Sequence, residues 1–149
     1  MKKKLQLQTV IHIKDSLSRD IVELQKDIIK YNNSEKKVDT LFETLDKKEA
    51  QMIVIKEAIQ KANRDKHKDG KTNNYYIYRL SNLNGKRVMI QDLLQEHNAK
   101  TSQQSEESLK KDLSNILSEI DTVKSSLKTF NRDHKITVIL DESLNLLNE

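Results

Sequence analysis

The chain has 149 residues and a formal net charge of +4, and 34% of its residues are charged while only 4% are aromatic. It contains no proline, no cysteine and two glycines, a composition typical of long amphipathic helices. The absence of cysteine excludes a disulfide framework, a thiol nucleophile and cysteine-ligated zinc or iron–sulfur sites.

The first part of the chain opens with lysines like a signal peptide, but Gln6, Gln8 and His12 interrupt its apolar stretch. The longest aliphatic runs, at residues 52–55 and 136–140, are far shorter than the roughly 20 apolar residues that span a bilayer. We therefore expect a cytoplasmic protein without a membrane partner.

Two helices joined by a short polar connection are expected at about residues 5–31 and 35–62. In each helix, apolar residues follow one another at spacings of four and three and so form a heptad seam, a narrow apolar line along one side. One lysine interrupts each seam, Lys14 in the first helix and Lys48 in the second. This spacing is typical of coiled coils, and a short connection makes consecutive helices antiparallel neighbours.

The second of these helices carries more apolar residues than a single seam requires. A two-stranded coil buries only a narrow seam, so the wider stripe predicts a third or fourth helix alongside. The additional residues are Phe42, Ile53, Val54 and Ala58.

A polar hinge at residues 63–72 follows, in which Asp69-Gly70 predicts a turn because glycine accepts a positive φ. Thr72, Asn73 or Asn74 is expected to cap a third helix at about residues 73–98. Gly85 costs that helix about 1 kcal/mol relative to alanine, so the helix either kinks or divides there. One continuous helix is favoured.

A polar linker at residues 99–105 leads to a fourth helix at about residues 106–130, whose seam is the most regular of the chain. In the tail, residues 131–149, apolar residues follow two different spacings. Alternation like that of a short strand is seen at Ile136, Val138 and Leu140, and spacing like that of a helical turn at Leu144 and Leu147.

The four seams predict an all-α protein with a single domain, residues 1–149, built as an elongated antiparallel four-helix bundle or as coiled-coil hairpins. Long, narrow seams often pair with a second copy of the same chain. We therefore expect a homo-oligomer.

No pattern in the sequence points to catalysis or to a cofactor. The four histidines lack the spacing of metal ligands and are expected at the solvated surface or rim. Neither glycine belongs to a phosphate-binding loop, and no serine lies in a nucleophile elbow. We expect a protein that is not an enzyme and holds neither metal nor cofactor.

The basic charge is local. Residues 61–87 carry eight lysines and arginines against two aspartates, a net +6, so the rest of the chain sums to −2. Basic residues among tyrosines suit phosphate backbones and stacked bases. A solvated rim, with Tyr76 and Tyr78 covering the end of the core, is the competing interpretation and is weighed more heavily. The candidate contact residues are Arg64, Lys66, Lys68, Lys71, Tyr75, Tyr78, Arg79, Lys86 and Arg87.

The second helix ends in Ile-x-x-Ala-Asn at residues 59–63, the turn at residues 69–72 reads Asp-Gly-Lys-Thr, and the fourth helix ends near Asn131. This layout resembles the septicolysin-like family of small bacterial helical proteins. Residues 84–87 read Asn-Gly-Lys-Arg where that family carries Arg-Asp-x-Leu in the third helix, and Arg132 stands in place of its tryptophan. The resemblance implies an all-helical, oligomeric bundle and no particular activity.

The sequence thus predicts a non-enzymatic protein that works by helix-mediated assembly or protein interaction, with residues 62–87 as its exposed contact surface. The alternative is a nucleic-acid-binding module that uses the same basic, tyrosine-containing tip, residues 61–87. A membrane-surface role ranks lower, because the basic residues lie mostly in the turn and not on a helix with a bulky apolar face.

Overall fold

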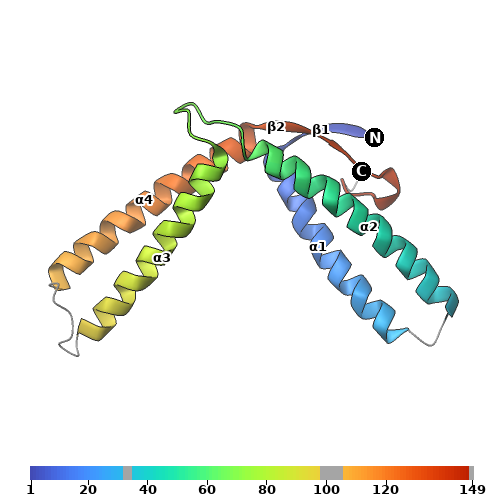
Figure 1. Ribbon diagram of the computed structural model, residues 1–149, viewed down its shortest axis with the longest axis horizontal. Helices are drawn as coiled ribbons and strands as arrows, with labels where there is room; N and C mark the ends of the chain where they lie inside the picture. Colours follow the sequence, from blue (N-terminus) through green and yellow to red (C-terminus); the bar gives the residue numbers. More distant parts are fainter. Residues whose placement is uncertain (32–34, 98–105, 148–149) are drawn as a thin grey trace. The chain divides into compact units, whose positions relative to one another are not determined.

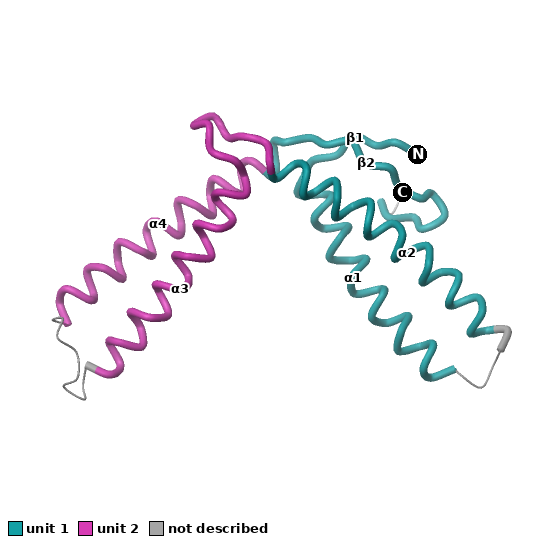
Figure 2. The backbone as a smooth tube through the Cα atoms, viewed as in Figure 1, with its two compact units in different colours: residues 1–63, 131–149 teal, residues 64–130 magenta. Residues whose placement is uncertain are grey.

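The computed structural model describes residues 1–31, 35–97 and 106–147 (Figure 1). Within them the chain is mostly helical, in the order β1, α1, α2, α3, α4, β2 and a short 3-10 turn, η1. The predicted helical class is confirmed at this level, and the structure adds a two-stranded sheet. The chain divides into two compact units, residues 1–63 with 131–149 (unit 1) and residues 64–130 (unit 2) (Figure 2).

The four helices agree closely with the expected ranges. Their bounds are α1 Leu7–Lys30, α2 Glu35–Ala62, α3 Asn73–His97 and α4 Glu106–Asp133. α1 begins two residues later than expected because residues 5 and 6 belong to a strand. α4 continues past residue 130 for most of another turn, where Arg132 favours the negative end of the helix dipole. The connection at residues 32–34 and the linker at 99–105 lie outside the described residues.

Unit 1 contains the sheet. β1 (Lys2–Gln6) pairs antiparallel with β2 (Lys135–Ile139), with Lys2 opposite Ile139 and Gln6 opposite Lys135. Beyond one end of this pairing, the backbone N–H of Leu7 donates to the backbone carbonyl of His134 at 2.7 Å. The tail therefore does contain the expected strand, followed by the turn η1 at Glu142–Leu144.

The core of unit 1 lies where the hairpin meets the sheet. Fully buried side chains come from α1, α2 and β2, namely Leu7, Val10, Leu17, Ile55 and Val138. Farther along the hairpin the seam is only half-buried, as at Ile21, Leu24 and Ile28 of α1 and at Val38 and Leu41 of α2. Two helices alone bury one narrow side of each, and the sheet adds cover at one end only.

Gln51 joins α2 to the outer edge of β2. Its side-chain amide donates to the carbonyl of Ile139 at 2.9 Å and accepts from the N–H of Asp141 at 2.6 Å. The glutamine is itself buried, and its two hydrogen-bonding atoms are satisfied by the last residue of β2 and by Asp141, two residues farther on. This side chain therefore occupies part of a sheet edge that would otherwise present free backbone groups.

Unit 2 is the hairpin of α3 and α4, which lie side by side (Figure 1). Leu83, Ile120 and Val123 form its buried cluster, and partly buried apolar side chains pack against it, including Tyr76, Leu80, Ile116 and Leu127. No helix among the described residues has both the length and the apolar character that a membrane crossing needs.

Candidate functional site

The tip loop, residues 64–72, is an ordered turn. Lys66 and Thr72 form an isolated antiparallel bridge, and the N–H of His67 donates to the carbonyl of Lys71 at 2.8 Å. Gly70 has φ = 86°, the left-handed value for which glycine is suited, and its N–H donates to the carbonyl of His67 at 2.9 Å. The turn predicted at Asp69-Gly70 is therefore present.

His67 anchors this loop to the end of the α3–α4 hairpin. Its ring stacks on Phe130 of α4, with centroids 4.5 Å apart and planes 9° from parallel, and lies 4.4 Å from the ring of Tyr76. His67 Nε2 lies 2.8 Å from Oδ1 of Asn73, a side chain that is almost fully buried. This anchor could not be predicted from the sequence, because Phe130 is remote from His67 along the chain and the heptad pattern does not relate the two residues.

Tyr76 and Asp69 form a second tie across the loop. The tyrosine hydroxyl donates to the Asp69 carboxylate. This hydrogen bond, together with burial and the negative charge of Asp69, raises the pKa of Tyr76 to about 12. The same bond, with a further one from the backbone N–H of Lys71 at 2.9 Å, lowers the pKa of Asp69 below its usual value.

Thr72 caps α3. Its Oγ1 accepts from the N–H of Tyr75 at 3.1 Å, which satisfies one of the free donors of the first turn. Among the three residues that the sequence suggested for this cap, Thr72 thus makes the capping bond. Asn73 has a different place, since it is buried next to His67 and its N–H donates to the carbonyl of Asp65 at 2.9 Å.

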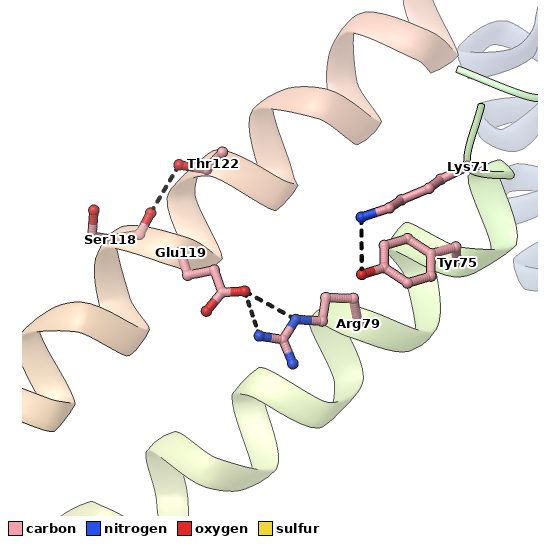
Figure 3. Close-up of polar contacts among 6 residues, drawn as sticks. All are labelled: Lys71, Tyr75, Arg79, Ser118, Glu119 and Thr122. Atoms are coloured by element: carbon pink, nitrogen blue, oxygen red, sulfur yellow. Dashed lines mark hydrogen bonds and ion pairs between the residues drawn. The ribbon is translucent and has the colours of Figure 1, made fainter. Parts of the chain in front are cut away.

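Five of the nine candidate contact residues lie on the loop or on the first turn of α3. Arg64, Lys66 and Lys68 are exposed, and their side chains make no hydrogen bond or ion pair within the part of the chain that the structure describes. Lys71 points toward Tyr75 (Figure 3), with Nζ 4.6 Å from the ring centroid and 3.5 Å from the hydroxyl. This contact is a cation–π interaction.

The other four candidates lie farther along α3. Tyr78 is highly exposed, whereas Arg79 is already paired with Glu119 of α4 (Figure 3), to which its Nε donates at 3.0 Å. Lys86 and Arg87 lie 13 and 14 residues beyond the start of α3, about 20 Å along the helix. The structure therefore groups the loop residues and leaves Lys86 and Arg87 apart from them.

Tyr76 and Tyr78, the two tyrosines expected to cover the end of the core, differ in how far they are buried. Tyr76 packs against the buried cluster of unit 2, and Tyr78 is 66% exposed. Figure 3 also shows the adjacent surface of α4, where the Thr122 hydroxyl donates to the carbonyl of Ser118 at 3.1 Å. Among the side chains that the structure describes, no three of His, Asp or Glu gather so that they could hold a metal ion.

The tip loop thus presents three exposed cations next to a lysine–tyrosine pair, on a turn that is held in place by His67 and Tyr76. Such an arrangement can bind an anionic or aromatic partner. No protein-family model, curated protein or solved structure matches this chain. The resemblance to the septicolysin-like family stays a prediction.

Proposed function

We propose that this is a non-enzymatic protein that acts by helix-mediated assembly. In this proposal the long helices close their apolar seams against helices of another copy, as an antiparallel four-helix bundle or coiled coil. The supporting observation is that large apolar side chains remain exposed on both hairpins. Burying one such side chain contributes about 1.5–3 kcal/mol, so a few of them are enough to drive association.

The wide stripe of α2 supports the proposal most directly. Phe42, Ile53, Val54 and Ala58 are the residues for which the sequence predicts an additional helix. The first three are exposed, Ile53 by 60%, and Ala58 is half-buried. Val22 and Ile29 of α1 are also exposed. A helix from a second copy, laid along Phe42 and Ile53, which lie about 20° apart around α2, would bury both of these side chains.

The mass of the native protein tests this proposal. Light scattering coupled to size exclusion, run over a wide concentration range, should give at least twice the chain mass of 17.4 kDa at high concentration. The mass should fall on dilution and should not change after nuclease treatment. A strict monomer throughout the range would refute assembly.

A nucleic-acid-binding role is the second candidate, and the tip loop favours it. Arg64, Lys66 and Lys68 are exposed without a partner among the described residues, and Tyr78 presents an exposed ring farther along α3. Lysine and arginine side chains bind phosphates and release counterions, while exposed tyrosine rings stack on bases.

This second role predicts single-strand binding that weakens steeply with salt. Replacing Lys66, Lys68 and Lys71 by glutamine should reduce the slope of log K against log salt by about 2, because three phosphate contacts are lost. Fluorescence anisotropy of a labelled oligonucleotide measures that slope.

The matched control replaces Lys26, Lys56 and Lys124, which are also exposed, and so removes the same charge elsewhere on the chain. An equal loss in this control variant would indicate attraction by net charge alone. Binding that is absent or independent of salt eliminates the nucleic-acid role.

A further inference from the structure

α3 is apolar on two opposite sides. Leu83 is fully buried against α4. With about 100° between successive residues of a helix, four large apolar side chains fall on the side opposite to Leu83. They are Ile77, Tyr78, Val88 and Met89, with exposed fractions of 38%, 66%, 48% and 55%.

We define the outer face of α3 as these four residues together with Ser81 and Gly85, which fall between them on the same side of the helix, and with Asn74 and Asp92, which lie on that side nearer its two ends. Between Asn74 and Asp92 no residue of this face carries a charge, in a chain in which 34% of residues are charged. A solvated helix face normally carries charged side chains. An uncharged strip with four exposed apolar side chains is typical of a surface that binds a partner.

Gly85 lies at the middle of this face. It has no positive φ, since Gly70 is the glycine with that conformation in the described chain. A Cβ added at Gly85 would meet no atom within 4 Å. Neither the backbone nor the packing of this chain therefore requires glycine there, although glycine disfavours a helix. A second backbone that approaches closely would make use of the missing side chain.

The outer face has the same pattern when it is read in either direction from Leu83. Large apolar pairs stand at its two ends, residues 77–78 and 88–89, and the small residues Ser81 and Gly85 lie inside them. A two-fold interface needs such self-complementarity, because residue i then contacts residue j while residue j contacts residue i.

Two α3 helices laid antiparallel, with their Leu83 residues at the same level, satisfy this condition. Tyr78 of one copy then opposes Val88 of the other, and Ser81 opposes Gly85. Positions 74, 78, 81, 85, 88 and 92 of this face follow spacings of four and three residues, the spacing by which helices pair along a seam. Ile77 and Met89 lie at the two edges of the paired surface.

Charge favours the antiparallel direction. The basic tip loop precedes α3, whereas Asp92 lies on the outer face near the other end of the helix and is exposed. In the antiparallel pair Asp92 of one copy opposes Asn74 of the other, in the first turn of α3 next to the basic tip loop. A parallel pair would instead place two basic loops together.

We propose that the outer face of α3 is an interface for a second copy of this chain, bound antiparallel about a two-fold axis. The proposal rests on the assembly proposed above and names one surface through which two copies would pair. Small residues at the centre permit close approach of the two helices, and the apolar pairs at each end supply the buried area.

Cysteine cross-linking tests the register, and the chain has no cysteine of its own. Chains carrying Tyr78→Cys and chains carrying Val88→Cys should form a disulfide when they are mixed and oxidised. Neither variant should do so alone, because two copies of position 78 lie about 15 Å apart along the axis. A disulfide needs Cα atoms within about 7 Å.

Ile53→Cys, an equally exposed position on α2, serves as the matched control and should not cross-link to either variant. Links between two copies of the same variant, with no link between Tyr78→Cys and Val88→Cys in the mixture, would show a parallel pair and overturn the proposal. A link from position 78 or 88 to position 53 would show that α2 covers the outer face, and would overturn it as well.

Gly85→Arg provides an independent readout. The new side chain meets nothing in its own chain, so helicity and thermal stability at low concentration should not fall, while self-association should weaken at least tenfold. Ser114→Arg adds the same charge to the exposed surface of α4 and should leave association unchanged.

The outcomes separate the two proposals. If the wild-type chain associates but Gly85→Arg has no effect and positions 78 and 88 do not cross-link, the α3 interface is wrong and assembly stands through another face. If the wild-type chain is a monomer at all concentrations, both proposals fail.

Discussion

Ring contacts hold the tip loop against the end of the α3–α4 hairpin. His67 lies between Phe130 and Tyr76, and Tyr76 in turn donates a hydrogen bond to Asp69. Ring contacts of this kind contribute about 0.5–1.5 kcal/mol each beyond the area that they bury. The exposed cations of the loop are therefore displayed on a turn with a defined conformation.

The Tyr76–Asp69 hydrogen bond makes a titration prediction. Because the bond raises the pKa of Tyr76 to about 12, one tyrosine should titrate well above the ordinary value of 10, as followed by tyrosinate absorbance. Asp69→Asn should return that tyrosine toward 10. The control Asp121→Asn, at an exposed position of α4, should leave it near 12.

The Tyr76–Asp69 hydrogen bond also determines how the folding stability should change with pH. Tyr76 has a raised pKa when folded, so its contribution is complete below pH 10 and is lost as pH rises through about 12. Asp69 has a lowered pKa, so its contribution is present above pH 3.8 and is lost as pH falls below that value. A stability difference between wild type and Tyr76→Phe that grew outside this window would contradict the assignment.

The composition of the sequence indicates which residues could contact a partner. It does not indicate which of them are already bound to another side chain of the same chain. The cluster of basic residues around the turn is evident in the sequence, and Arg64, Lys66 and Lys68 are indeed exposed. That Arg79 is already paired with Glu119 depends on how α3 and α4 pack. No local pattern reports a partner 40 residues away.

At the level of the helices, the two glycines should respond in opposite ways to substitution by alanine. Gly85→Ala should stabilise the chain by about 1 kcal/mol, since it restores helix propensity and the new Cβ meets no atom. Gly70→Ala should destabilise it by about 1 kcal/mol, because φ = 86° strains any residue with a Cβ.

Urea unfolding at a concentration low enough to keep the chain monomeric measures both glycine variants, so that association does not contribute. A loss of stability in Gly85→Ala would mean that α3 is kinked or closely contacted at this residue within one chain.

Helices were predictable from the sequence because their apolar spacing is local. The expected ranges 35–62 and 73–98 agree with α2 and α3 within a residue. β1 was not predicted, because Lys2–Gln6 has no alternation of apolar and polar residues and is a strand only through its pairing with β2. The strand at β2 was predicted, since alternation is visible at residues 136–140.

At the scale of the whole molecule, assembly through one two-fold face would be self-limiting. A two-fold interface uses the same surface on both copies and leaves no equivalent surface free for a third. The mass measured by light scattering should then level off at twice 17.4 kDa. Continued growth with concentration would point to a second interface, for which the exposed stripe of α2 is the available surface.

The sheet also has a consequence for the order in which the chain folds. Unit 2 is contiguous, residues 64–130, whereas unit 1 combines residues 1–63 with residues 131–149. Met1 and Leu140 bond to each other across 139 positions, so the sheet can form only after β2 has left the ribosome. On the ribosome α3 and α4 can pair first. The N-terminal hairpin would then wait with part of its core uncovered. We expect this late, non-local closure to be the slowest step of folding and the one most open to aggregation.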